Sequence, residues 1–128
     1  MKITGGDILV LFISDLARTR DFYENKLGME YVHGDERSAV YSTDNGVLLM
    51  LDHEGADDLL GSEHVDHERQ TGAHGVIVAG VEDVDSAYAE LTSLGVEFVR
   101  PPEDRAWGKR TAHFRDPDGH IFELNHDL

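Results

Sequence analysis

The sequence predicts an α+β fold of two βαβββ modules. Two stretches of the chain show the same order of apolar run, amphipathic helix and short strand-like runs. They align segment by segment, SDLARTRDFYENKLGMEYV with EDVDSAYAELTSLGVEFV and NGVLLML with DGHIFEL, which is an internal repeat. An acidic stretch separates them. We therefore expect one compact domain made of a module at 1–52, an acidic linker or flap at 53–73, and a module at 74–128.

The first module opens with a continuous apolar run, Ile8–Ile13, which is typical of a strand buried on both faces. Asp15 can cap the following helix by accepting backbone N–H groups, and Gly28 can end that helix in the left-handed conformation. Asp44-Asn45-Gly46 is a strong hairpin signal. The pattern then predicts three strands, at 29–33, 39–43 and 47–51.

The second module repeats this order. We expect a strand at 76–81, a helix at 84–94, a short strand at 97–99 and a loop from Pro101 through Gly108. The stretch RTAHFRDPDGHIFEL follows, with strand-like runs on both sides of Asp116-Pro117-Asp118-Gly119. Proline presets φ and glycine tolerates positive φ, so the chain reverses there.

The acidic stretch between the modules has a different composition. It holds seven carboxylates between Asp52 and Glu68 against a single arginine, Arg69, so we interpret it as a solvated linker or mobile flap. Its histidines, His53, His64 and His67, raise the alternative of a metal site. A flexible acidic loop lacks the rigid surroundings that metal sites use, so the linker interpretation is preferred.

Composition excludes several classes of function. The 128 residues carry a net charge of −15, which argues against binding a nucleic-acid backbone. No apolar run is long enough for a membrane span, and no secretory signal is present. There are no cysteines, which excludes disulfides and thiolate chemistry and fits a cytoplasmic protein. The acidity fits either a solubilising surface or a cleft that attracts a cationic ligand.

The repeat indicates where a site would lie. With the helices on the outer face, the two sheets would form a curved mixed sheet around a shared cleft. Glu123 stands between Phe122 and Leu124, and a buried carboxylate needs a partner or a wet cavity. If Glu123 faces the cleft, the alignment places Met50 there as its counterpart, and strand alternation adds Phe12.

These residues resemble a known family. The repeated βαβββ plan, the start SDLARTRDFY, LGM, the opening VEDV and WGKRTAHFRDPDGHIFEL resemble the vicinal oxygen chelate superfamily. That superfamily includes glyoxalase I, extradiol dioxygenases, and fosfomycin- and bleomycin-resistance proteins. The resemblance implies the fold, but one scaffold hosts many activities.

In the enzymes of this family, side chains from the first and last strand of each module hold a divalent metal. Carried over residue by residue, those positions are Ile8, Met50, Val76 and Glu123. Among them only Glu123 suits a hard or borderline cation, whereas catalytic zinc uses three protein ligands. We therefore expect no metal and no other cofactor.

What remains resembles the metal-free bleomycin-resistance branch, which confers antibiotic resistance by sequestering a drug unchanged. The resemblance implies a homodimer, with modules exchanged between chains as one option, and a small-molecule ligand, with cationic aromatic compounds as one class. The candidate ligand-binding residues are Phe12, Met50, Trp107, Arg110, His113 and Glu123. Trp107 can stack on a planar ligand, and Arg110 can either neutralise Glu123 or pair with Asp104 or Asp116.

Two alternatives make the chain an enzyme. A metal-dependent lyase or dioxygenase of the glyoxalase type would need a rearranged ligand set that adds His74 or His113 to Glu123. A metal-free acid–base enzyme would use His113 and Glu123 as its catalytic pair, because an imidazole and a carboxylate suffice in principle. The sequence does not show that these two side chains meet.

Overall fold

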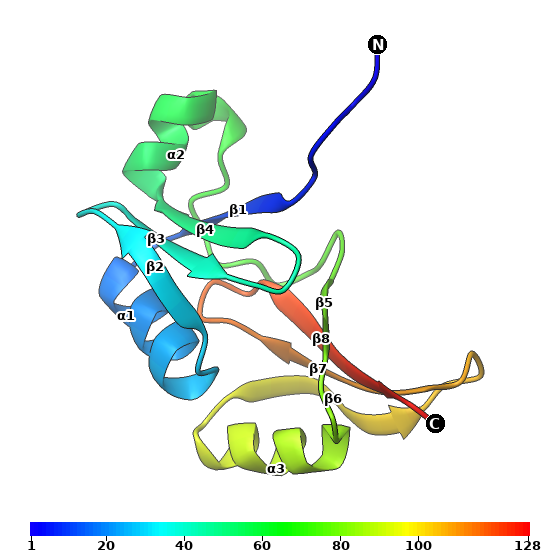
Figure 1. The fold of residues 1–128 in the computed structure, drawn as a ribbon. Helices are drawn as coiled ribbons and strands as arrows, with labels where there is room; N and C mark the ends of the chain where they lie inside the picture. Colours follow the sequence, from blue (N-terminus) through cyan, green and yellow to red (C-terminus); the bar gives the residue numbers. More distant parts are fainter. The chain divides into compact units, whose positions relative to one another are not determined.

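A computed structural model describes residues 1–128 and gives the fold drawn in Figure 1. The chain divides into two compact units, Met1–Glu68 and Arg69–Leu128. The stretch 53–73, which we expected to be a linker or flap, forms two short helices within the first unit, and its last residues, 69–73, open the second unit without a helix or strand. No helix combines the length and the apolar character needed to cross a membrane.

The first unit holds a four-stranded sheet in the order β1-β4-β3-β2. β1 runs parallel to β4, and the other neighbouring strands are antiparallel. Its elements are β1 Ile8–Ile13, α1 Leu16–Arg20, the π-helix η1 Asp21–Lys26, β2 Glu30–Gly34, β3 Ser38–Ser42, β4 Val47–Asp52, α2 His53–Leu60 and the 3₁₀-helix η2 Ser62–His64.

The second unit repeats this plan with a sheet in the order β5-β8-β7-β6, in which β5 is parallel to β8. Its elements are β5 Ile77–Gly80, α3 Val84–Ser93, β6 Glu97–Asp104, β7 Lys109–Arg115 and β8 Ile121–Asp127. The prediction of an α+β fold from paired βαβββ modules is confirmed.

The first predicted helix differs from expectation because it changes type partway. α1 is capped by the Asp15 carboxylate, which accepts from the Arg18 N–H at 3.0 Å, and the chain then widens into the π-helix η1. The π-helix buries the adjacent Phe22 and Tyr23, and the rings of Tyr23 and Tyr41 of β3 stack with centroids 5.6 Å apart. The wider turn thus brings two neighbouring aromatic residues onto the sheet.

Helix α2 forms where the sequence indicated a solvated stretch. Asp52 caps it by accepting from the Gly55 N–H at 2.8 Å. Arg37 pairs with Glu54 at 2.5 Å and with Asp58 at 3.1 Å, two carboxylates one helical turn apart. A capping residue and one arginine therefore order a segment that composition alone marks as a loop. α1 and α2 lie on opposite sides of the first sheet (Figure 1).

The second sheet packs on α3 through a chain of aromatic contacts. Tyr88 of α3 meets Phe98 of β6 with centroids 4.6 Å apart. Phe98 then meets Phe114 at 5.6 Å, and Phe114 stacks on Phe122 at 5.1 Å. These contacts fix which face of β7 and β8 is turned toward α3.

Strand β6 extends through Pro101 and Pro102, where we expected a loop. β6 is an edge strand, and an edge strand tolerates proline because one side of its backbone has no partner strand. Breaks in its register with β7 lie between Phe98 and Arg100 and between Arg100 and Glu103.

The turn at Asp116–Gly119 holds the segment that enters the second unit. The Asp118 carbonyl accepts from the Gln70 N–H at 3.0 Å, and the Pro117 carbonyl accepts from Arg69 at 3.1 Å. Gly119 has φ +91°, and a Cβ there would collide with the carbonyl oxygen of Gln70. The motif therefore requires glycine for two reasons, its conformation and its contact with Gln70.

Candidate functional site

Polar side chains gather on the face of the second sheet that is turned away from α3. Because Phe114 and Phe122 point toward the helix, strand alternation places their neighbours on the opposite face. We call that face the polar face. Its members on β7 and β8 are Thr111, His113, Arg115, Ile121, Glu123 and Asn125.

Glu123 is held from two sides. His113 lies directly opposite Glu123 in the β7–β8 register, and its Nε2 is 2.9 Å from Glu123 Oε1. Asn125 donates from Nδ2 to Glu123 Oε2 at 3.0 Å. The side chains of His113 and Glu123 are only 17% and 18% exposed. An ionised carboxylate only accepts hydrogen bonds, so the ring donates through Nε2 when Glu123 is charged.

The second ring nitrogen of His113 has no hydrogen-bond partner, although it is buried. In the neutral ring that donates through Nε2, Nδ1 is an acceptor. Most buried polar atoms are satisfied, so the unpartnered Nδ1 makes the pair a candidate for a functional role. A carboxylate paired with an imidazole can fix a ligand donor or pass a proton.

A second polar network lies beside this pair. The hydroxyl of Thr111, which is fully buried, accepts from Arg105 Nε at 2.8 Å. Glu103 binds Arg105 and Arg100, both at 3.1 Å. The hydrogen bond from Arg100, with the charges of both arginines, holds the pKa of Glu103 below its usual range. Arg100 and Arg105 are thus already paired with a carboxylate.

The border of the polar face along β5 is apolar and open. Val78 lies beside Glu123 in the parallel register and is 59% exposed. Gly80 lies beside Asn125, and a Cβ built there would meet no atom within 4 Å. A ligand at Glu123 therefore has apolar surface and free space on one side.

Met50 is not the structural counterpart of Glu123. Ala39, Val40 and Tyr41 pair with Met50, Leu49 and Leu48, whereas Ala112, His113 and Phe114 pair with Leu124, Glu123 and Phe122. The counterpart of Glu123 is thus Leu49. The loop at 43–46 is one residue shorter than the loop at 116–120, which shifts the sequence alignment by one. Met50 is fully buried, on the sheet face that carries Tyr41.

Phe12 lies on the expected face of the first sheet. It is level with Leu51 in the β1–β4 register, so it shares the face of Leu49 and points away from the one that carries Tyr41. The counterpart of Phe12 in the second unit is Gly80, which is likewise next to the last strand. The structure thus places Phe12 within the apolar first sheet.

Arg110 and Trp107 do not join Glu123 within the second unit. Arg110 binds Asp85 of α3 at 2.8 and 2.9 Å and Asp104 at 2.8 Å, which places it on the α3 side of the sheet. The pairing with Asp104 is the structural alternative that the sequence suggested. Trp107 is 70% exposed in the β6–β7 loop. Trp107 precedes β7, and the stretch from Lys109 to His113, the partner of Glu123, alone spans roughly 13 Å at ~3.3 Å per residue, so Trp107 lies far from Glu123 along the sheet.

The residues at the family's metal positions do not fit a metal. Ile8 and Val76 have hydrocarbon side chains and are 62% and 47% exposed. At the remaining position the aligned Met50 is buried, and Leu49, which the register puts there instead, has a hydrocarbon side chain. His74 lies before β5, which begins at Ile77. No three His, Cys, Asp or Glu side chains are grouped so that they can hold a metal ion together. Near α2, His67 Nε2 instead binds Asp57 Oδ1 at 2.6 Å.

Strand alternation in the sequence places Asn125 beside Glu123, but the sequence interpretation did not count it among the ligand-binding residues, although it is the second residue that fixes Glu123. The signal was available, because residues two apart on a strand share a face. Thr111 and Arg105 were also missed. Their contact depends on the register of β6 and β7, which contains two irregularities that no sequence pattern reveals.

Comparison with known proteins places the fold and the family. The model of the Glyoxalase/Bleomycin resistance protein/Dioxygenase superfamily matches residues 6–124. A glyoxalase/bleomycin resistance protein/dioxygenase from Nocardioides superposes with a TM-score of 0.85 at 24% identity, over 100% of this chain and 86% of that one.

Two relatives are similar in sequence. The uncharacterised protein YraH of Bacillus subtilis is 29% identical over 117 residues, 89% of this chain and 91% of that protein. The metallothiol transferase FosB of Bacillus licheniformis is 29% identical over 124 residues, 97% of this chain and 76% of that protein. With a family model matched over nearly its whole length, the chain belongs to the glyoxalase/bleomycin resistance protein/dioxygenase superfamily.

Proposed function

We propose that the chain binds a small molecule without a metal ion, with Glu123 as the polar anchor, in the manner of the bleomycin-resistance branch. One observation carries this proposal. Glu123 has each oxygen held by a neighbouring side chain, His113 or Asn125, while the positions that would share a metal with it carry Ile8, Val76 and its structural counterpart Leu49. The carboxylate is kept, and the residues that would share a metal with it are not.

The surroundings of Glu123 support a ligand that is partly apolar. Val78 offers exposed hydrocarbon surface beside the carboxylate, and Gly80 leaves free space beside Asn125. The paired arginines at Glu103 are not free to attract an anion. A carboxylate favours a ligand that brings a hydrogen-bond donor or a positive charge. A cationic aromatic compound satisfies both requirements.

The proposal extends to the assembly. We propose a homodimer, since apolar side chains are exposed on the edge strands, with Ile8 and Leu9 on β1 and Val78 on β5. Sedimentation of the purified chain tests this part by itself. A monomer at all concentrations would remove the dimer and leave the proposal for Glu123 unaffected.

The binding proposal is tested by metal analysis and ligand titration on the same preparations. We expect no stoichiometric metal, and binding of cationic aromatic compounds that persists in a chelator. Glu123→Gln keeps the shape of the side chain and removes its charge, so it should weaken binding at least ~10-fold, as loss of a charge-assisted hydrogen bond does. Glu90→Gln on α3 makes the same charge change elsewhere and should leave the affinity unaltered.

A second candidate function is metal-free acid–base catalysis, and the 2.9 Å contact between His113 and Glu123 favours it. Turnover of a bound compound in chelator, lost in both His113→Gln and Glu123→Gln, would identify this function. Recovery of each bound compound unchanged would exclude it for that compound.

The metal-dependent alternative is supported by the relative named metallothiol transferase, at 29% identity. Near-stoichiometric divalent metal that disappears in Glu123→Ala would overturn the metal-free proposal. Lyase, dioxygenase and thiol-transfer assays with the metal-loaded protein would then be the next step.

A further inference from the structure

The start of α3 is capped by two side chains from different parts of the second unit. Asp83 accepts from the N–H groups of Asp85 and Ser86 at 3.0 and 3.3 Å. The N–H of Val84 donates instead to Nδ1 of His126 on β8, at 2.9 Å and 42 residues away in sequence. The first N–H groups of a helix have no partner within it, so both side chains stabilise the first turn.

A ring nitrogen that accepts a hydrogen bond carries no proton. His126 is therefore neutral in this arrangement, with its proton on Nε2. Protonation of Nδ1 would set one donor against another. It would also place a positive charge at the start of a helix, where the helix dipole is positive. The bond from Val84 can form only while the ring is uncharged.

We propose that His126 is a pH-sensitive latch that ties the first turn of α3 to β8 and opens when the ring gains a proton. Histidine is the side chain that ordinarily changes charge between about pH 5 and 8. Because the closed form needs the neutral ring, the latch is closed at the upper end of that interval and opens as the pH falls.

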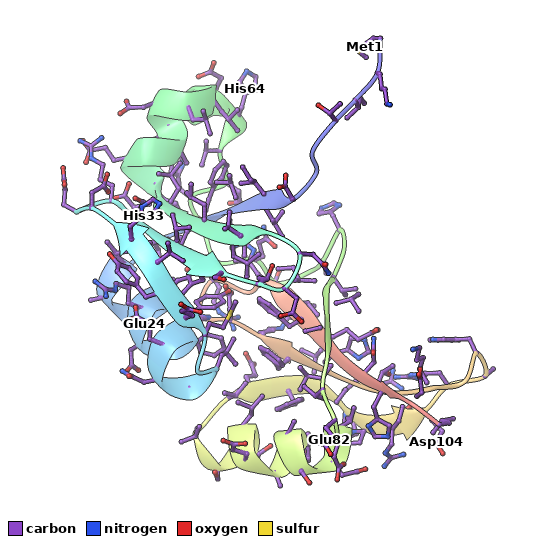
Figure 2. All side chains as sticks on the ribbon, in the orientation of Figure 1. Met1, Glu24, His33, His64, Glu82 and Asp104 are labelled. Atoms are coloured by element: carbon purple, nitrogen blue, oxygen red, sulfur yellow. The ribbon has the colours of Figure 1, made fainter.

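Charged groups face His126 from each element around it. They are Asp83 and Asp85 at the start of α3, where Glu82 precedes the cap, Asp127 next to His126 on β8, with its partner Lys109, Arg110 opposite His126 on β7, and Asp104 of β6, which binds Arg110. Figure 2 labels Glu82 and Asp104, which lie toward the same end of the second unit.

These groups act on the ring in opposite directions. Arg110 lies opposite His126 in the β7–β8 register, but its charge is shared with Asp85 and Asp104. Asp85 and Asp127 both attract a positively charged His126. Protonation therefore removes the bond from Val84, while the charges of Asp85 and Asp127 favour the charged ring.

NMR of the intact chain tests the latch at two atoms. Nitrogen chemical shifts of the His126 ring should show the proton on Nε2 at pH 8. The protection of the Val84 amide against hydrogen exchange, corrected for the intrinsic rate, should fall about fivefold from pH 8 to pH 5, the change that one ordinary hydrogen bond gives. A ring protonated on Nδ1 at pH 8, or unchanged protection at Val84, would overturn the proposal.

Variants separate the latch from general acid loosening. His126→Asn places an amide oxygen near the position of Nδ1, so Val84 should stay protected at both pH values. His126→Phe removes the acceptor and should give low protection at both. His33→Gln, on β2 of the first unit and labelled in Figure 2, should keep the response of the natural chain. An unaltered pH response in His126→Asn would show that another group opens the turn.

Discussion

The two sheets share one strand order and differ in the chemistry of a single face. On the first sheet the face away from α1 carries Val40, Leu49 and Leu51. The matching positions of the second sheet carry His113, Glu123 and Asn125. The two modules thus share their strand order, but only the second module carries polar side chains on this face.

This difference shows that residues aligned between the two modules in sequence need not occupy equivalent positions in the two sheets. One extra residue in the second hairpin moves every later side chain by one place relative to the aligned sequence. Because successive residues of a strand face opposite sides, a shift of one residue changes which face each side chain occupies. A methionine in the core was thus aligned with a carboxylate on the polar face.

The largest effects on stability are expected from alanine substitutions at the glycines of the two hairpins, Gly46 and Gly119. Gly119→Ala must accept φ +91° and displace the Gln70 backbone, so it should lower the free energy of unfolding by about 3 kcal/mol or more. Gly46→Ala needs no positive φ, but its Cβ would collide with the Asp7 backbone at least as closely, so it should also be strongly destabilising through the collision alone. Urea denaturation of both variants measures the difference.

Gly95→Ala is the control for conformation alone. It has φ +83° and nothing within 4 Å of a Cβ, so it should cost about 1 kcal/mol. Equal costs for Gly95→Ala and Gly119→Ala would mean that the contact between Gly119 and Gln70 contributes nothing.

The second prediction concerns Met50 and its position in the core. Met50→Ala should lower stability by about 2–5 kcal/mol, because it opens a cavity at a fully buried position. Ligand affinity under native conditions should not change. Loss of affinity without loss of stability would restore Met50 to the site and contradict the placement of Leu49 as the counterpart of Glu123.

The third prediction contrasts the carboxylate of the first unit that faces the core, Glu24, with Glu123. Arg20 donates to Glu24 at 2.7 Å and the Tyr41 hydroxyl donates at 2.7 Å. The hydrogen bond from Arg20, helped by that from Tyr41, holds the pKa of Glu24 below its usual range. A lowered pKa in the folded state gives stability that is present above the unfolded value, about 4.3, and is lost as the pH falls.

Glu24→Gln should therefore cost about 1–2 kcal/mol at pH 7 and progressively less below about pH 4. Thermal unfolding of this variant and the natural chain across that interval measures the difference. A cost that stays constant with pH would show that the packing of the side chain matters and its charge does not.

The smallest effect is expected from Asn125→Leu, which gives the polar face the residue found at Leu51 of the first unit. It removes one donor from Glu123 and should cost about 1 kcal/mol. In a Glu123→Leu background the same change should cost nothing, since the bond is already gone. A full cost in both backgrounds would mean that Asn125 acts through other contacts.

Much of the fold could be predicted because the same order of strands and helix occurs twice in the sequence. The caps at Asp15 and Asp83 and the hairpin turns place the helices and most strands. Helix α2 was not predicted, although its cap Asp52 directly precedes it, because its ion pairs with Arg37 come from a residue elsewhere in the sequence. Composition describes a segment by itself and omits the tertiary partners that hold it.

The site shows the same limit. Glu123 was recognisable as a carboxylate on an apolar strand, but its contact with His113 depends on the β7–β8 register. Arg110 was an equally reasonable partner in the sequence, yet strand alternation puts it on the α3 side. A shift of one residue in the register decides whether two residues of neighbouring strands meet. The length of the connecting loop sets that register, and amino-acid composition does not reveal it.

The lock between the Asp116–Gly119 turn and Gln70 has a consequence for how the chain acquires its structure during synthesis. Gln70 emerges from the ribosome well before the turn that binds it, and β5 has its only sheet partner in β8. The first unit, residues 1–68, has all of its sheet pairings within itself. It can therefore form while the second unit still waits for the hairpin that closes it, and the growing chain passes through a stage with one finished sheet and one unpaired strand.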